Sequence, residues 1–364
     1  MNRLRPFPLV LIVLIGAHLQ AQEMHPAVRN RVLAQVDEIE QSLRDHPLKA
    51  SDFPNFPKTS SALIEGARDA ANRGYLYLSL EKLGQLLTVV DSTRFAEEQA
   101  GRLAPGFPAF DAEWTKATQK LAVVESGLKS KNWSHASPGQ RALIEAARGR
   151  IGQMMSAARG FAVHEDTFSG LFYIGQALGQ ARFASLCASL DLDVRSQAKS
   201  HSVLPELQSL QEKALAAFVP PKSIELHSQF IVLNALLKTG FELDASRSYA
   251  GALYRYLDAS QAYRVLDGIE VDAAKKAELL DKLASLRREF NRSRAKDSID
   301  DIFLERAEAA ASNGTNATAA KWRTVEAVVD HVLPASSAAN LPVAASKQTS
   351  RKSVQLTLVR WPFT

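Results

Sequence analysis

Histidine and acidic side chains could bind a metal or transfer protons, but in this chain they are widely dispersed. No two histidines are four residues apart, the spacing that places two imidazoles on one helix face, and no Glu lies three residues before a His. The one cluster, His164-Glu165-Asp166, precedes an apolar segment and is interpreted as the start of a helix. We therefore expect no metal site and no cofactor.

Four of these groups would nevertheless be the first to test if the protein were an enzyme with a pocket formed by helices. Such an enzyme needs a proton donor and acceptor whose side chains converge on the substrate. The candidates are Glu65, Glu145, His164 and Glu165. This alternative stays open at the level of the sequence, because spacing alone does not show which side chains meet in space.

A set of serine and lysine motifs offers a second type of chemistry. Ser79-x-x-Lys82, Ser130-x-Asn132 and Lys238-Thr239-Gly240 occur in that order, and the set resembles the signature of penicillin-recognising serine enzymes. That resemblance implies a serine that attacks an acyl carbonyl while a nearby base takes its proton. In such an enzyme the Lys-Thr-Gly triplet should lie on a strand. Here Lys238 instead ends an apolar helical pattern. An acyl-serine hydrolase is therefore disfavoured.

Tyrosines supply the best candidate for a binding surface. Tyr249, Tyr256 and Tyr263 recur at seven-residue intervals on one face of a predicted helix. Tyr254 lies elsewhere on that helix, and two more tyrosines occupy matching positions near the starts of other helices. Tyrosine combines an apolar ring with a polar tip, which suits an extended peptide or glycan. The predicted partner-binding set is Tyr77, Tyr173, Tyr249, Tyr254, Tyr256 and Tyr263.

The helices that must position these residues are organised around the segment 168–190. It carries a single charged residue, Arg182, and is otherwise apolar or small nearly all round, which indicates a helix buried among others. Gly175 and Gly179 would let a neighbouring backbone approach it. The remaining chain predicts amphipathic helices, including separate ones over 75–90 and 93–103. We expect an all-α fold of about a dozen antiparallel helices packed pairwise.

A weak internal similarity leaves the higher-order arrangement open. The segment 62–68 nearly recurs as 142–148, and Gly-x-x-Tyr occurs at Gly74, Gly170 and Gly251. Stacked helix pairs would bury a continuous core and form an irregular superhelix. Chance similarity among alanine-rich helices explains the pattern equally well, so both interpretations stand.

The two ends of the chain differ in character from its middle. Arg3 and Arg5 precede the apolar run Leu9–Ala17, and Leu19-Gln20-Ala21 matches a cleavage site, so residues 1–21 are predicted to be a secretory signal peptide. Residues 22–334 form the predicted helical domain, with a subdomain junction near 191–202. Residues 335–364 are predicted to be a flexible tail rich in alanine and serine.

Export and cysteine content together suggest the location of the protein. Cys187 is the only cysteine, and it falls in the apolar segment, so no intramolecular disulfide forms. Secreted eukaryotic domains more often carry paired cysteines, which favours the bacterial cell envelope, in the periplasm or outside the cell. After signal cleavage no stable membrane span is expected, because Gln176, Gln180 and Arg182 interrupt the segment most able to cross a bilayer.

Charge and composition narrow the class of partner. Charged residues make up 23% of the chain and the net charge is +5, evenly scattered, which gives no basic patch for nucleic acid. The sequence thus predicts an exported, non-enzymatic helical protein that binds another envelope component, either a protein or a polymer. The alternatives are an enzyme with a helix-lined pocket and a protein embedded in the membrane through 168–190.

Overall fold

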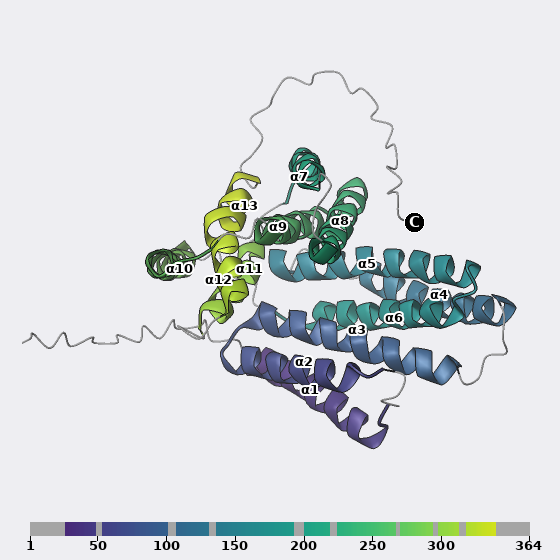
Figure 1. Cartoon of the computed structure of the whole chain (residues 1–364). Coiled ribbons are helices and arrows are strands. Elements are labelled where there is room, and N and C mark those ends of the chain that lie inside the picture. Colours follow the sequence, from purple (N-terminus) through teal and green to yellow (C-terminus); the bar gives the residue numbers. More distant parts are fainter. Residues whose placement is uncertain are drawn as a thin grey trace, which may run out of the picture.

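The computed structural model describes residues 26–48, 53–100, 107–130, 136–192, 200–218, 224–266, 270–293, 298–312 and 318–339. Within these ranges the chain is helical, without strands (Figure 1). The first half contains α1 (Pro26–Asp45), α2 (Phe56–Asn72), α3 (Leu76–Ala100), α4 (Phe107–Ser130), α5 (Pro138–Val163) and α6 (Thr167–Ser189). The second half contains α7 (Leu204–Ala217), α8 (Ile224–Ala245), α9 (Tyr249–Leu266), α10 (Ala273–Ser293), α11 (Ile299–Ala311), α12 (Ala319–Ala327), the π-helical segment η3 (Val328–Val332) and α13 (Leu333–Ala339). The predicted all-α fold is confirmed.

Helix α6 is the buried centre of the first half, as its sequence predicts. It packs against α3, α4 and α5, and twelve of its residues are buried. A Cβ atom at Gly175 would lie 2.5 Å from the Cα of Ser92, and one at Gly179 would lie 2.7 Å from the Cα of Thr88. Both distances are shorter than any real contact, so the absence of a side chain at each glycine lets the α3 backbone pack directly on α6.

Helix α3 runs without a break, which corrects the prediction of separate helices over 75–90 and 93–103. The polar run Asp91-Ser92-Thr93 lies where the break was predicted, and there Ser92 Oγ and Thr93 Oγ1 both donate hydrogen bonds to the Val89 carbonyl. These hydroxyls are therefore satisfied within the helix. The result is a 25-residue helix that extends along one side of α6.

Figure 1 shows α1–α6 lying together, with the helices of the second half gathered on one side of them. Helix α5 connects the two groups, since it contacts α6 in the first half and α8, α9 and α11 in the second. Ser137 caps α5 by accepting a hydrogen bond from the Gln140 amide, and Pro138 follows at the first turn. That start of a helix is the one the sequence predicts.

A charged cluster ties α3, α9 and α11 together near the centre of the fold. Arg306 on α11 donates to both carboxylate oxygens of Glu81, to Asp258 Oδ1 at 2.8 Å and to the Tyr254 hydroxyl at 2.9 Å. The Tyr254 hydroxyl in turn donates to Glu81 Oε1 at 2.5 Å. Arg255 pairs with Asp258 at 2.9 Å. Several charges are therefore buried together and are paired with one another.

The structure tests the predicted boundaries only in part. Helix α13 continues through Ala339, so residues 335–339 are helical and do not belong to a flexible tail. Residues 340–364 and the predicted signal peptide lie outside the described residues, as does most of the predicted junction at 191–202. The three Gly-x-x-Tyr segments lie at the starts of α3, α6 and α9. Of their three glycines only Gly74 has a positive φ, of 82°, so the glycines have different roles and the repeat stays a prediction.

None of the helices in the described ranges is both long and apolar enough to cross a membrane.

Candidate binding groove

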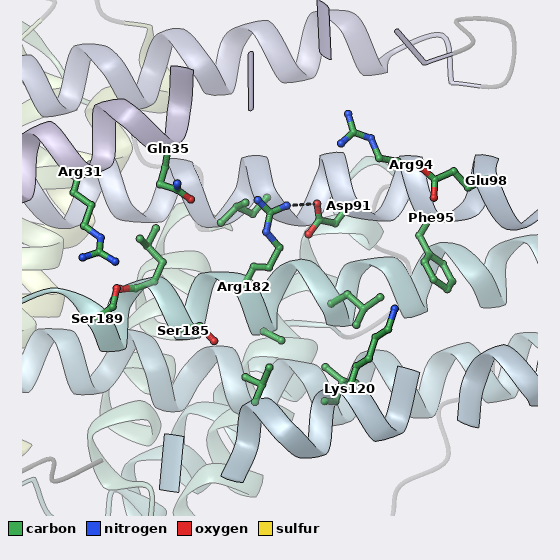
Figure 2. Close-up of a pocket in the computed structure, with 16 residues that line it drawn as sticks. Arg31, Gln35, Asp91, Arg94, Phe95, Glu98, Lys120, Arg182, Ser185 and Ser189 are labelled. Atoms are coloured by element: carbon green, nitrogen blue, oxygen red, sulfur yellow. Dashed lines mark hydrogen bonds and ion pairs between the residues drawn. The ribbon is translucent and has the colours of Figure 1, made fainter. Parts of the chain in front are cut away.

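A cavity of about 640 Å³ is an open groove along α6. We call it the α6 groove (Figure 2). One stripe of α6 lines it, formed by Leu178, Arg182, Ser185 and Ser189, at helical spacings of four, three and four residues. From Leu178 to Ser189 there are eleven rises of 1.5 Å, which corresponds to a length of about 16 Å. The groove is therefore a property of the central helix.

Two helices form the walls of the α6 groove, and a third closes one end. Helix α3 contributes Leu87, Asp91, Arg94, Phe95 and Glu98, and α4 contributes Lys120, Leu121 and Val124. Helix α1 contributes Arg31 and Gln35, which Figure 2 shows at the end near Ser189. Both α3 and α4 pack on α6, but they hardly touch each other. The space left between them is the groove.

The floor of the α6 groove is apolar. Leu87, Leu121, Ala181 and Leu186 are buried at its base, and Leu178 is half-buried among them. An occupant with an apolar face would pack that face on these side chains. The apolar area of the occupant would then leave water, which favours binding at roughly 25 cal/mol per Å².

The rim of the α6 groove carries an excess of positive charge. Four cations line it, Arg31, Arg94, Lys120 and Arg182, against the two carboxylates Asp91 and Glu98. Arg182 is paired with Asp91 at 2.7 Å. Burial raises the pKa of Asp91, and the Arg182 charge acts in the opposite direction.

The other cations of the rim differ in how they are held. Arg94 donates hydrogen bonds to the hydroxyl and carbonyl of Ser42. Arg31 and Lys120 are exposed, and no ion pair to either is found within the described ranges. Their charges are therefore available to an acidic partner.

Two of the predicted tyrosines lie in the interior and are not part of any surface. Tyr77 is 1% exposed and its hydroxyl lies 3.0 Å from Ser137 Oγ, and Tyr254 is 4% exposed within the Arg306 cluster. Desolvation raises the pKa of Tyr254 far above its ordinary value, with the Glu81 charge as a second cause. Both residues stabilise the core, which corrects their assignment to a partner-binding surface.

The other four predicted tyrosines are half-buried, in three different places. Tyr173 belongs to an aromatic cluster at the α5–α6 turn, 5.2 Å from Phe161 between ring centroids. Tyr249 begins α9. Tyr256 and Tyr263 line a smaller cavity beside α7. The six tyrosines therefore do not form one surface, although two of them share a cavity.

The candidate acid–base residues are not brought together. Glu65 is exposed on α2, and His164 and Glu165 are exposed in the turn after α5. Glu145 accepts a hydrogen bond from the Gly251 amide at 2.8 Å, and burial raises its pKa. No hydrogen bond or ion pair connects the four in the described part of the chain, and there no group of histidine, cysteine and acidic residues is arranged to hold a metal.

The nucleophiles considered from the sequence have structural roles. Ser79 is fully buried and donates to the Leu76 carbonyl at 2.7 Å, and Lys238 lies inside helix α8 and not on a strand. Burial raises the pKa of the Cys187 thiol, which keeps it protonated and unreactive.

Comparison with known proteins adds no family. No protein-family model matches the chain, and neither curated proteins nor solved structures give a match. Any function proposed for this chain therefore rests on its own sequence and geometry.

The α6 groove was not predicted, although the sequence contained a signal for it. Arg182, Ser185 and Ser189 are polar residues that fall on one stripe of a helix whose only charged residue is Arg182. A helix enclosed on all sides has no reason to carry them on a common stripe. That stripe marks the side of α6 that α3, α4 and α5 leave open.

Proposed function

We propose that this protein is an exported, non-enzymatic helical binding protein of the bacterial cell envelope, and that the α6 groove holds a segment of a partner protein. The observation that carries the proposal is the open stripe of α6, with its apolar floor and cationic rim. A buried central helix with one uncovered face provides the packing surface for one more helix.

The dimensions and charge of the α6 groove favour an amphipathic, acidic helix as the occupant. A length of about 16 Å accommodates about three helical turns. Apolar side chains at positions i, i+3, i+4 and i+7 of that helix would meet Leu178, Ala181 and Leu186. Its acidic residues would meet Arg31 near the Ser189 end of the groove and Lys120 on the α4 wall, where complementary charge sets orientation and accelerates association.

The proposed location rests on the N-terminal sequence. Arg3 and Arg5 followed by Leu9–Ala17 have the order of charge and hydrophobicity found in secretory signals. We expect the exported protein to begin at Gln22. N-terminal sequencing of the protein from a periplasmic extract tests this, and retention of Arg3 in a cytoplasmic fraction would contradict it.

A bulky substitution in the groove tests the binding site. Ser185 is exposed on the groove stripe, so Ser185→Trp fills the groove without disturbing the core. Gln119→Trp is the matched control, because Gln119 is exposed on α4 and does not line the groove. Both variants should keep the helical circular dichroism signal, which shows that the added indole leaves the fold intact.

The measurement is site-specific photo-crosslinking in the native envelope, followed by mass spectrometry of the adduct. A photoreactive residue at position 185 should join one amphipathic, acidic segment, and one at position 119 should not. Ser185→Trp should abolish co-purification of that partner, and Gln119→Trp should preserve it. Equal co-purification with both variants would remove the α6 groove from the binding site.

A further inference from the structure

A second cavity, of about 500 Å³, lies between α7, α9 and η3. We call it the α7–α9 cavity. None of its lining residues belongs to the α6 groove, so a ligand bound there is independent of the partner segment proposed for that groove. Its polar lining residues are Glu206, Ser209, Lys213, Tyr256, Ser260, Tyr263, Arg264 and His331.

Two tyrosine rings form the aromatic part of the α7–α9 cavity. Tyr256 and Tyr263 are seven residues apart on α9, so they lie on one face and about 10 Å apart along the helix axis. Both are half-buried, so part of each side chain stays accessible. Aromatic rings of this kind offer flat apolar surfaces at two successive points of an extended ligand.

Glu206 provides a hydrogen-bond acceptor that has no partner in the described structure. Its Oε2 atom is shielded from solvent and accepts no hydrogen bond there. Leaving a buried carboxylate oxygen unpaired is costly, and because solvent in the cavity does not reach Oε2, a ligand pairs with it once the carboxylate turns toward the cavity. Burial raises the pKa of Tyr256; the effect of Ser260, which lowers it, comes second, and the charge of Glu206, which raises it, comes third. Tyr256 therefore remains a neutral phenol that can donate as well as accept.

A buried carboxylate holds two further side chains at the α7–α9 cavity. Glu326 is 8% exposed, and its Oε1 atom lies 3.4 Å from Arg264 Nη2 and 3.1 Å from His331 Nε2. His331 comes from η3, where the wider helical turn interrupts the regular helix between α12 and α13. Such π-helical turns are frequent at functional sites.

We propose that the α7–α9 cavity binds a sugar unit of a glycan. The hydroxyl groups of a sugar both donate and accept, so they match Glu206 as acceptor, Lys213 and Arg264 as donors, and Ser209 and Ser260 as either. The C–H face of the ring packs against Tyr256 or Tyr263. A purely apolar ligand would leave these polar groups of the cavity without partners.

Calorimetric titration of the full mature chain, Gln22–Thr364, tests this proposal. The probes are two neutral β-linked trisaccharides, chitotriose and cellotriose. Glu206→Met removes the acceptor at similar volume and should weaken binding about tenfold, the loss expected for a hydrogen bond to a charged group. Glu212→Met is the matched control, because Glu212 is an exposed acid on α7 outside the cavity, and it should bind as the unaltered protein does.

A second measurement locates the bound sugar. Addition of the trisaccharide should shift the imidazole NMR signals of His331 and leave those of His164, which is remote from this cavity, in place. Binding of either trisaccharide with both results supports the proposal. Failure of both sugars to bind at millimolar concentration, or equal affinity of the Glu206→Met and Glu212→Met variants, would overturn it.

Discussion

Replacement of Arg306 should damage the fold through charge alone. Its side chain is 16% exposed, and its partners Glu81 and Asp258 are 9% and 17% exposed. Arg306→Met keeps a long apolar stem but leaves both carboxylates largely buried without their shared cation. Breaking a buried ion pair from one side costs about 3–5 kcal/mol, mostly because the remaining charge is uncompensated. We expect a loss of stability in that range.

Another arginine, Arg150 of helix α5, supplies the control for Arg306. Arg150 is also surrounded by protein, where burial, followed by the charge of Arg255, lowers its pKa to about 10. It forms no ion pair in the described ranges. Arg150→Met therefore removes a cation whose desolvation is poorly compensated. We expect a change of stability within about 1 kcal/mol, in either direction.

Urea unfolding at neutral pH, followed by far-ultraviolet circular dichroism, measures both variants against the unaltered protein. Adding Glu81→Gln to Arg306→Met should recover part of the loss, because it removes one of the two stranded charges. The reasoning is refuted if Arg306→Met costs less than about 1 kcal/mol, or if Arg150→Met costs as much as Arg306→Met.

Three further predictions concern the core and its titration. Gly179→Ala should cost about 1–3 kcal/mol of unfolding free energy because its Cβ would meet the α3 backbone, whereas Gly160→Ala, with no atom within 4 Å of its Cβ, should gain about 0.5–1 kcal/mol. Tyr77→Phe should cost about 1 kcal/mol of unfolding free energy because it loses the contact with Ser137. Tyr77→Ala should cost about 3–5 kcal/mol because it opens a cavity. Thermal unfolding measures the stability of these glycine and tyrosine variants against the unaltered protein. Burial raises the pKa of Asp300 from 3.8 to about 6, so the folded state binds this proton more tightly and the stabilisation is lost as pH rises through 6. Asp300→Asn should therefore flatten the stability profile between about pH 4 and 6 and gain up to about 3 kcal/mol at neutral pH; an unchanged profile would contradict the assignment.

Helices could be predicted from the sequence wherever local patterns determine them. Ser137 and Pro138 start α5 as predicted, because a cap and a fixed φ act within one turn. The buried position of α6 also follows from its own composition. The predicted break in α3 was wrong because Asp91 is held by Arg182 of α6, a contact 91 residues away in sequence. Tertiary contacts outweigh local propensity there.

The tyrosine surface illustrates what spacing cannot determine. A seven-residue interval shows that Tyr249, Tyr256 and Tyr263 share a face of α9, but not whether that face meets solvent. Tyr254 lies inside because Glu81, 173 residues earlier, accepts a hydrogen bond from its hydroxyl. Tyr77 lies inside because of Ser137. Each of these partners comes from a distant part of the chain, so periodicity within one helix could not reveal it.

The low charge of α6 and its single arginine indicate two different features, a buried helix and one open side. A nearly uncharged helix indicates burial, and α6 is buried on the sides that α3, α4 and α5 cover. Complete enclosure would also bury Arg182, and a buried unpaired cation is too costly to keep. Arg182 is instead exposed and paired with Asp91 across the groove. Its exposed position marks the open side of the central helix, where a partner helix can complete the packing.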